Sequence, residues 1–370
     1  MRIPNRFLLR ISPYLGFKTD RKIVVFESDD WGAIRMSSKD NLNRLAKNGF
    51  NVYSNSYESN DCLESSHDLS ELAAVLSSYK GNNDTMPVFT LNYAMANPEF
   101  TKIKASEYTT YHFEPFTTTF RHYYGENYPL HLISQKGSLL FPQFHCREHL
   151  NVTKWMKALR DNEYNMRWIM DCGCVGTHIN QVGGNPYVMA YNYSTQEELS
   201  TVKESIVEGL SMFQKIFGFY SRTAIAPNYL WGKELLDIFK CNNIECLQGG
   251  HFQIKPSISS GRVMHWMGQK SKGLYFSIRN CTFEPTQMKN NAVDRCIHDI
   301  ATAFRHRQPA VVCSHRINYV SHINPQNPKI GLSQLNLLLH QILQRWPDIE
   351  FMTSDGLLDL FSSHAKNTDL

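Results

Sequence analysis

Two adjacent carboxylates follow a short apolar run near the start of the chain. Residues 23–26 have the composition of a buried strand, and Glu27, Ser28, Asp29 and Asp30 come directly after them. The sites of α/β proteins lie at the carboxyl ends of parallel strands. Because neighbouring aspartates repel each other unless a cation or a proton neutralises one of them, the pair indicates a metal site. This segment alone leaves open an alternative, in which one aspartate caps the next helix beside a solvated neighbour.

Two histidines four residues apart follow another apolar run, residues 138–141. On a helix or its first turn, His145 and His149 would share one face, within reach of a single metal ion. The chain has 15 histidines, so the spacing gains its weight from its place after a strand. Arg147 and Glu148 lie between them, either as a surface ion pair or as residues that orient a ligand.

A third histidine, His315, follows the apolar run 310–313, where a structural and a catalytic role are equally plausible. The run 223–226 ends at a proline, and Asn228 and Tyr229 come after it. One carboxylate and two imidazoles suit Zn²⁺ with an open position for water, while a second carboxylate and another histidine supply a base and an acid. Together these residues predict metal-assisted hydrolysis.

Elements that position these residues alternate along the chain. The runs typical of buried strands are residues 23–26, 87–91, 138–141, 223–226, 244–247, 275–278, 310–313 and 349–352. The clearest helix covers residues 194–217, with a capping box from Ser194 to Glu197 and an end at Gly218, and further helices cover residues 291–304 and 332–346. Residues 53–84 and 172–193 are interpreted as loop insertions that shape a site. Alternating strands and helices predict an α/β fold, either a barrel or an open sheet.

Composition narrows the class of protein. The 370 residues are 42% hydrophobic, which suits one well-packed globular domain. A net charge of +4 without a long basic block does not favour nucleic acid as a partner, and no apolar run reaches the roughly 18 residues of a transmembrane segment. Nine scattered cysteines indicate a reducing compartment. Since the first residues do not resemble an export signal, we expect a cytoplasmic protein.

The order of these motifs resembles the NodB-homology polysaccharide deacetylases, carbohydrate esterase family four. The family's first motif, Thr-Phe-Asp-Asp-Gly, is similar to residues 27–31, its second motif, His-Ser/Thr-x-x-His, to residues 145–149, and its late Leu-x-His motif to residues 313–315. The resemblance spans about residues 21–360. It implies a distorted (β/α)7 barrel with loop insertions over residues 21–362, between an N-terminal segment, 1–20, and a C-terminal tail, 363–370.

The resemblance also implies a role for each residue. Asp29 is expected to be the general base, and His315 the acid that protonates the leaving group. Asp30, His145 and His149 are expected to bind one divalent metal ion, with Zn²⁺ before Co²⁺ or others. The implied reaction is hydrolysis of an acyl group, most simply N-acetyl, from a carbohydrate that is a polysaccharide or a sugar precursor. Such an enzyme is a hydrolase of carbon–nitrogen bonds other than peptide bonds.

Two motifs of the family are altered here. Its third motif, Arg-x-Pro-Tyr, aligns with residues 225–228 and lacks the arginine that orients the base, for which Arg222 and Arg279 are candidate replacements. Its fourth motif, an Asp-rich segment, is replaced by residues 279–285, which could supply an arginine or a glutamate. A protein that binds glycan without turnover is therefore an alternative.

Four residues are expected to contact the substrate: Trp31, Asn228, Tyr229 and Arg279. The rings of Trp31, Tyr229, Trp231 and Trp266 could stack on sugar faces, although burial in the core is the commoner fate of tryptophan.

A separate hypothesis is a structural zinc site formed by Cys172, Cys174 and His178. Two cysteines separated by one residue offer poor tetrahedral geometry without further ligands, which disfavours it.

Overall fold

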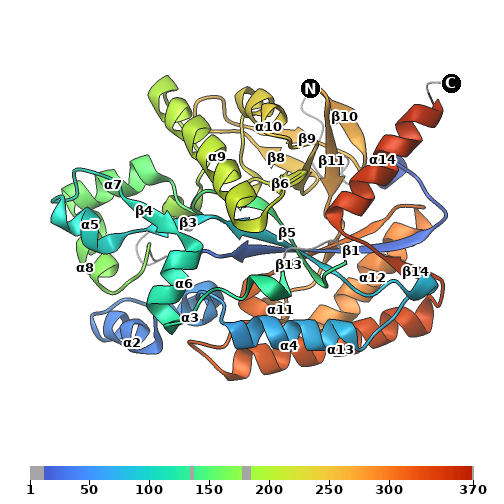
Figure 1. The fold of residues 1–370 in the computed structure, drawn as a ribbon, viewed down its shortest axis with the longest axis horizontal. Helices are drawn as coiled ribbons and strands as arrows, with labels where there is room; N and C mark the ends of the chain where they lie inside the picture. Colours follow the sequence, from blue (N-terminus) through green and yellow to red (C-terminus); the bar gives the residue numbers. More distant parts are fainter. Residues whose placement is uncertain (1–11, 134–136, 177–184, 369–370) are drawn as a thin grey trace.

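A computed structural model describes residues 12–133, 137–176 and 185–368 of the chain. At its centre lies a 10-stranded sheet surrounded by helices (Figure 1). The hydrogen-bonded order is β10 (Gln269–Ser271), β11 (Leu274–Ile278), β7 (Cys246–Gly249), β6 (Thr223–Ile225), β5 (Leu140–Cys146), β2 (Phe89–Ala94), β1 (Lys22–Trp31), β13 (Ala310–His315) and β12 (Cys281–Thr282), with β14 (Ile349–Phe351) beside β1. Each of the eight predicted strands is confirmed.

Pairing in this sheet is parallel except between β10 and β11. Two small antiparallel hairpins lie outside it, β3 (Ala96–Pro98) with β4 (Phe113–Pro115) and β8 (Phe252–Ile254) with β9 (Arg262–Met264). Within the described residues, no hydrogen-bonded pair joins β12 to β10 at the two ends of the order. The fold is therefore a mixed α/β fold with a mostly parallel central sheet.

The helices connect and cover the strands. They are α2 (Lys39–Lys47), α3 (Ser56–Asn60), α4 (Ser66–Ser77), α5 (Phe100–Ala105), α6 (Phe116–Tyr124), α7 (Val152–Asp161), α8 (Met166–Asp171), α9 (Gln196–Phe217), α10 (Leu236–Cys241), α11 (Pro285–Met288), α12 (Ala292–Arg305), α13 (Gln326–Arg345) and α14 (Ser354–Thr368). The predicted helices correspond to α9, α12 and α13. The cap of α9 lies one residue later than predicted, because Thr195 accepts from the backbone of Glu198.

The prediction of a loop over residues 53–84 was wrong. This stretch contains α3 and α4, and α4 begins with a capping box in which Ser65 and Asp68 satisfy each other's backbone N–H groups. Leu72 and Leu76 of α4 are buried in the core, so packing and capping together stabilise the helix. The described residues of the other predicted insertion, 172–176 and 185–193, contain one short 3₁₀ turn, Pro186–Val188.

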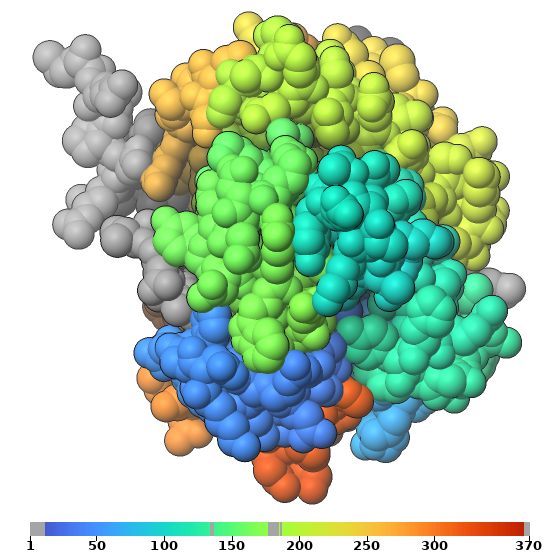
Figure 2. Space-filling model, turned by 90° about the vertical axis from the view of Figure 1, so that its left-hand side faces the viewer, coloured from blue at the N-terminus to red at the C-terminus, as the bar shows by residue number. Residues whose placement is uncertain are grey.

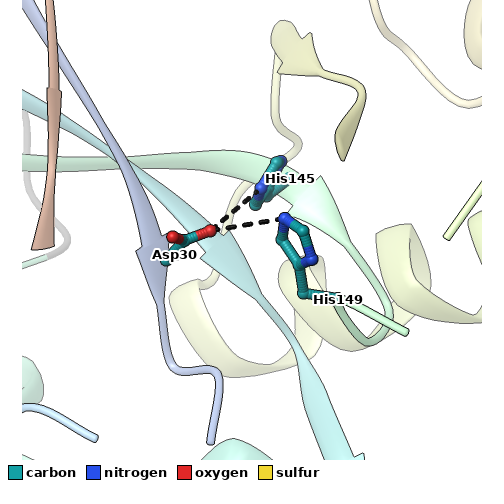
Figure 3. Close-up of side chains that lie close together, drawn as sticks. All are labelled: Asp30, His145 and His149. Atoms are coloured by element: carbon teal, nitrogen blue, oxygen red, sulfur yellow. Dashed lines mark ion pairs between the residues drawn. The ribbon is translucent and has the colours of Figure 1, made fainter. Parts of the chain in front are cut away.

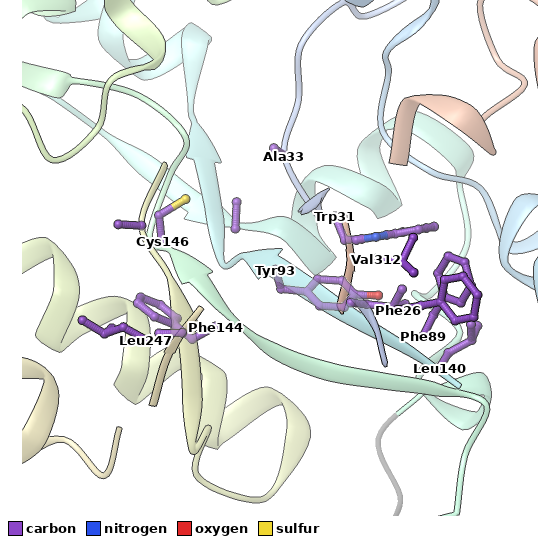
Figure 4. Close-up of a cluster of buried hydrophobic side chains, with 14 of the residues drawn as sticks. Phe26, Trp31, Ala33, Phe89, Tyr93, Leu140, Phe144, Cys146, Leu247 and Val312 are labelled. Carbon is purple, nitrogen blue, oxygen red and sulfur yellow. The ribbon is translucent and has the colours of Figure 1, made fainter. Parts of the chain in front are cut away.

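The central strand β1 is buried on both faces, as expected for the middle of a parallel sheet. Phe26 stacks on Phe89 with ring centroids 4.9 Å apart, in the large cluster shown in Figure 4. Val25 belongs to a second cluster with Val311 and Leu357 of α14. The sheet thus holds β1 and its neighbours rigidly, which positions the residues at their carboxyl ends.

The carboxyl end of β1 points toward the side where α2, α5, α7 and α8 gather (Figure 1). Figure 2 shows that side, where the blue segment around α2 lies next to the green segment of α7 and α8. Because β5 and β13 belong to the same parallel sheet, their carboxyl ends lie at this edge too. Among the described residues, no helix has the length and apolar character needed to cross a bilayer.

Candidate metal centre

The three predicted metal ligands lie together. Oδ1 of Asp30 is 3.6 Å from Nε2 of His145 and 3.4 Å from Nε2 of His149 (Figure 3). The two imidazole centroids are 5.0 Å apart. All three side chains are nearly or fully shielded from solvent. A carboxylate oxygen and two ring nitrogens that converge in this way form a candidate site for one divalent cation.

Register shifts in β1 and β5 determine the direction in which these side chains point. Against β2, Ser28 pairs with Leu91 and Trp31 with Tyr93, so β1 contains one residue more than its partner over this interval. Asp30 has a left-handed backbone, with φ of 74°. Alternation along a regular strand would send Asp29 and Asp30 to opposite faces, but here both line one pocket. A non-glycine residue in this conformation costs about 1–3 kcal/mol, a strain typical of functional sites.

The histidine pair does not lie on a helix, contrary to the sequence-based prediction. His145 belongs to β5, whose register against β2 shifts at this point, and His149 lies in the turn that follows. The helix α7 begins only at Val152, because Asn151 is its N-cap and accepts from the backbone N–H of Lys154 at 3.0 Å. The strand end and the turn therefore bring the two rings together.

Hydrogen bonding prepares His145 to bind a cation. Its Nδ1 lies 2.8 Å from the carbonyl oxygen of Ile225, which can only accept, so Nδ1 donates this bond and Nε2 is the nitrogen that offers a lone pair in the neutral ring. That Nε2 is buried and has no hydrogen-bond partner among the described residues. Burial lowers the pKa of His149 to about 3, so this ring is uncharged at neutral pH. An orphaned buried lone pair beside a carboxylate fits a bound metal ion.

Asp30 remains ionised in spite of its burial. Burial by itself raises the pKa of this carboxyl, but the basic groups around it, among which Arg35 keeps its charge when the imidazoles are neutral, hold the pKa well below its usual value. A negatively charged oxygen is what a divalent cation requires of this ligand.

Asp29, the predicted base, is held by Arg279. The guanidinium donates to both carboxylate oxygens, from Nη1 at 2.6 Å and Nη2 at 2.7 Å, and Asn92 donates a further bond at 2.8 Å. Burial raises the pKa of Asp29, but Arg279 more than offsets this effect and the pKa is lowered to about 2. Asp29 is therefore a carboxylate at neutral pH.

Arg279, one of the two candidate replacements for the missing third-motif arginine, is the one that contacts Asp29. The expectation that it contacts the substrate was wrong, because its side chain is 1% exposed and its Nε donates to Glu27 at 2.7 Å. The other candidate, Arg222, lies elsewhere and pairs with Glu245 and Asp359.

His315, the predicted acid, lies beside the base and is charged. Its Nδ1 is 2.6 Å from Oε1 of Glu284, and its Nε2 is 3.8 Å from Oδ2 of Asp29. Burial lowers the pKa of His315, but Glu284 raises it well above its usual value. Asn318 donates to the other oxygen of Glu284 at 2.8 Å and holds it in place. Glu284 is the glutamate that the altered fourth-motif segment was expected to supply.

A pocket of about 430 Å³ joins these groups. Its lining residues are Asp29, Asp30, Arg35, Tyr57, His145, His149, Val188, Met189, Ala226, Asn228, Tyr229, Ile254 and His315. Asn228 and Tyr229 line it as predicted, and both have left-handed backbones. The backbone N–H of Tyr229 donates to the carbonyl of Ala226 at 3.0 Å. Arg35 and Tyr57 were missed, since nothing in their local sequence signals a site.

The expectation that Trp31 contacts substrate was wrong. Its side chain is fully buried in the core (Figure 4). Its indole N–H donates to Ser28 at 3.0 Å. Trp231 is also buried, stacked beside His265 and Phe276. The burial of both rings stabilises the fold, because it removes their apolar surface from water.

Cys172 and Cys174 are buried free thiols, and Cys174 donates to the carbonyl of Gly176. His178, the third residue of the proposed structural zinc site, lies outside the described residues. Among those that are described, neither cysteine belongs to a group of three metal ligands.

No protein-family model matches the sequence, and no curated protein matches it. Three solved structures share distant likeness. A 4-α-glucanotransferase from Thermococcus litoralis is 10% identical, with 92% of this chain and 40% of that protein covered and a TM-score of 0.44. A CE4 family pseudoenzyme from Bacillus anthracis is 9% identical, with 91% and 66% covered and a TM-score of 0.37. A mutant of the peptidoglycan deacetylase PdaC from Bacillus subtilis is 7% identical, with 94% and 95% covered and a TM-score of 0.34.

This chain spans less than half the length of the glucanotransferase and about two thirds of the pseudoenzyme. Since every one of these TM-scores is below 0.5, no argument about the site or the function rests on them.

Proposed function

We propose that this protein is a metal-dependent hydrolase that removes an acyl group, most simply N-acetyl, from a carbohydrate. The observation that carries the proposal is the convergence of Asp30, His145 and His149 in one pocket, with Asp29 and His315 beside them. A base, an acid and a cation site within one cavity are the requirements of hydrolysis at a carbonyl carbon. A distorted (β/α)7 barrel and a cytoplasmic location remain predictions that accompany it.

Asp30, His145 and His149 would hold one divalent ion, and Zn²⁺ is the expected ion because a carboxylate and two neutral imidazoles suit it. Such an ion would polarise the acyl carbonyl and its attacking water. Oδ1 of Asp30 faces both histidines. The left-handed backbone of this residue directs its side chain into the pocket.

Asp29 would accept the proton of the attacking water. Its low pKa makes it a carboxylate at neutral pH, and the two bonds from Arg279 fix its orientation. His315 would donate a proton to the departing nitrogen, because Glu284 keeps the imidazole charged. Base and acid lie 3.8 Å apart at their nearest atoms, so one bound substrate can reach both. The backbone of Asn228, in the left-handed conformation at the pocket, is the candidate donor to the oxyanion.

Binding of glycan without turnover is the second candidate. It is suggested by the altered third and fourth motifs, the third of which holds the arginine that orients the base in the family. Arg279 pairs with Asp29 and Glu284 pairs with His315, and these two ion pairs favour turnover. Normal binding of acylated glycans, without acetate release from any of them, would support the second candidate.

The proposal is tested first by metal content. The purified protein should hold about one divalent ion, and the double variant His145→Ala/His149→Ala should lose it, whereas the exposed His340→Ala should not. Unchanged metal content in the double variant contradicts the site.

Asp29→Asn should keep the metal and lower acetate release by about 10²-fold or more, because the base is gone. Full activity in that variant would remove Asp29 as the base.

A further inference from the structure

Arg35 has hydrogen-bond donors that face the candidate site. Its Nε donates to Oδ2 of Asp61 at 2.9 Å, and its Nη2 lies 3.7 Å from Oδ2 of Asp30, which is beyond hydrogen-bond distance. In the described part of the chain, Nη1 and Nη2 donate no hydrogen bond, and the residue lines the pocket. A guanidinium carries five N–H donors in a planar fork, so most of the fork of Arg35 is free to bind a ligand.

Arg279, which pairs with Asp29 of the same pocket without lining it, makes hydrogen bonds with all three of its guanidinium nitrogens. Its Nε, Nη1 and Nη2 all donate to carboxylates, those of Glu27 and Asp29. Its side chain is 1% exposed, against 13% for Arg35. Arg279 is therefore fully paired within the protein, whereas the side chain of Arg35 is partly exposed and lines the pocket.

Tyr57 stands beside Arg35 with a second free donor. The guanidinium carbon of Arg35 lies 5.1 Å from the Tyr57 ring centroid, and the rings of Tyr57 and His315 are perpendicular with centroids 5.8 Å apart. No hydrogen bond of the Tyr57 hydroxyl to the described residues is present, and this residue also lines the pocket. Burial, together with Glu284 and Asp30, raises the pKa of Tyr57, so its hydroxyl keeps the proton that it can donate.

The negative charges near Arg35 are shared with other cations. Asp61 accepts two bonds from Arg316 on its other oxygen, at 3.1 Å and 3.0 Å. Asp30 faces the two histidines with its Oδ1, and a metal ion bound there would draw on its charge. Arg35 thus shares Asp61 with Arg316 and would share Asp30 with a bound metal ion, and an anion that binds to its free fork would complete its pairing.

The remaining walls of the pocket have few polar groups that could bind an anion. Apart from the catalytic and metal groups, its remaining walls are formed largely by apolar side chains, Val188, Met189, Ala226 and Ile254. A charged substituent would avoid these walls, because they cannot replace its hydration. It would therefore be directed to Arg35 and Tyr57.

We infer that Arg35 and Tyr57 form an anion-binding subsite, and that the substrate is an acylated sugar with a carboxylate or phosphate close to its acyl group. The inference rests on the proposed function, since it places the acyl group at the metal centre. A carboxylate and a phosphate both present oxygen pairs that match a guanidinium fork, so this shared chemistry is what the subsite recognises.

Binding measured by calorimetry on the full chain, with and without added Zn²⁺, tests the subsite directly. The probes are N-acetylglucosamine, N-acetylmuramic acid as the carboxylate and N-acetylglucosamine 6-phosphate. At least one acidic probe should bind about 10-fold more tightly than the neutral one, a difference of about 1.4 kcal/mol. Which acidic probe binds more tightly distinguishes carboxylate from phosphate. Equal binding of all three probes overturns the inference.

Variants assign the preference to its residues. Arg35→Met should reduce the affinity for the acidic probe to that for the neutral probe, and Tyr57→Phe should weaken it by a smaller factor. Arg44→Met, an exposed arginine of α2, is the matched control and should keep the preference. Equal weakening of acidic and neutral probes by Arg35→Met would show a merely structural role. If that variant does not fold, Arg35→Lys replaces it and should lose part of the preference, because an ammonium keeps the charge without the fork.

Deacylation separates this inference from the proposed function. Acetate release from acidic probes well above that from the neutral probe supports both. Equal release from all probes contradicts the subsite alone. A binding preference for an acidic probe, without release from any acylated sugar, supports the subsite and contradicts the hydrolase.

Discussion

Two arginines of this protein make the same kind of contact in opposite surroundings. Arg222 pairs with Glu245 at 2.7 Å and Asp359 at 2.9 Å, and its side chain is 33% exposed. Arg279 pairs with Glu27 at 2.7 Å and Asp29 at 2.6 Å, and its side chain is 1% exposed. Either residue could have replaced the missing third-motif arginine, but only Arg279 reaches the predicted base.

The number of ion pairs that an arginine makes does not by itself indicate how much it contributes to stability or function. Water screens the pairs of Arg222, so such pairs contribute about 0–1 kcal/mol. The charges around Arg279 are shielded from solvent, and each must be matched within the protein. A buried ion pair is weak evidence for stability by itself, so the place of Arg279 at Asp29 indicates a functional reason for keeping it.

The largest effect is expected for Arg279→Met. This change leaves Glu27 and Asp29 buried without a cation, which should lower the free energy of unfolding by about 3–5 kcal/mol. The base also loses its two orienting bonds, so kcat/KM for deacylation should fall by about 100-fold or more. Urea unfolding and acetate release measure the two effects.

Arg279→Lys is the matched control for that variant, because it keeps the charge and loses the fork. It should be more stable than Arg279→Met and still less active than the wild type. If Arg279→Met retained full activity, the assignment of Arg279 as the residue that orients the base would be wrong.

A second effect concerns the acid. Glu284→Gln removes the charge that raises the pKa of His315, so at neutral pH the imidazole should lose its proton. Deacylation should fall by up to about 100-fold at neutral pH and recover as the pH is lowered. The basic limb of the pH–rate profile reports this shift. An unshifted limb would contradict His315 as the acid that is charged by Glu284.

A smaller effect concerns stability in acid. The pKa of Asp29 is about 2 in the folded protein, below the value of about 3.9 for an unfolded chain. The stability that Asp29 contributes is therefore fully present above pH 4 and is lost as the pH falls through about 2, an amount of about 2–3 kcal/mol. The difference in unfolding free energy between wild type and Arg279→Met should narrow over that range. A constant difference would show that Asp29 is not the group that Arg279 stabilises.

The smallest effect is expected for Arg222→Met. Because its pairs are screened by water, the free energy of unfolding should change by less than about 1 kcal/mol, with deacylation unchanged. Thermal unfolding and acetate release check this. A loss as large as that of Arg279→Met would remove the contrast between the two arginines.

The strands and the candidate metal ligands could be predicted from the sequence because their signals are local. A run of four apolar residues predicts a buried strand, and polar residues directly after it lie at the carboxyl edge wherever the sheet is parallel. Asp29, Asp30, His145, His149 and His315 were predicted in this way, and the pocket brings them together.

The ion-pair partners of the site residues, and the exposure of their side chains, could not be predicted from the sequence. The chain separates Arg279 from Asp29 by 250 residues and Glu284 from His315 by 31, and no local pattern selects such pairs. The irregular register of β1 likewise depends on its neighbour β2, and it decides that Asp29 and Asp30 face one pocket while Trp31 enters the core. Spacing along the chain determines which residue types follow a strand, whereas the twist, register and packing of the whole sheet determine what each side chain meets.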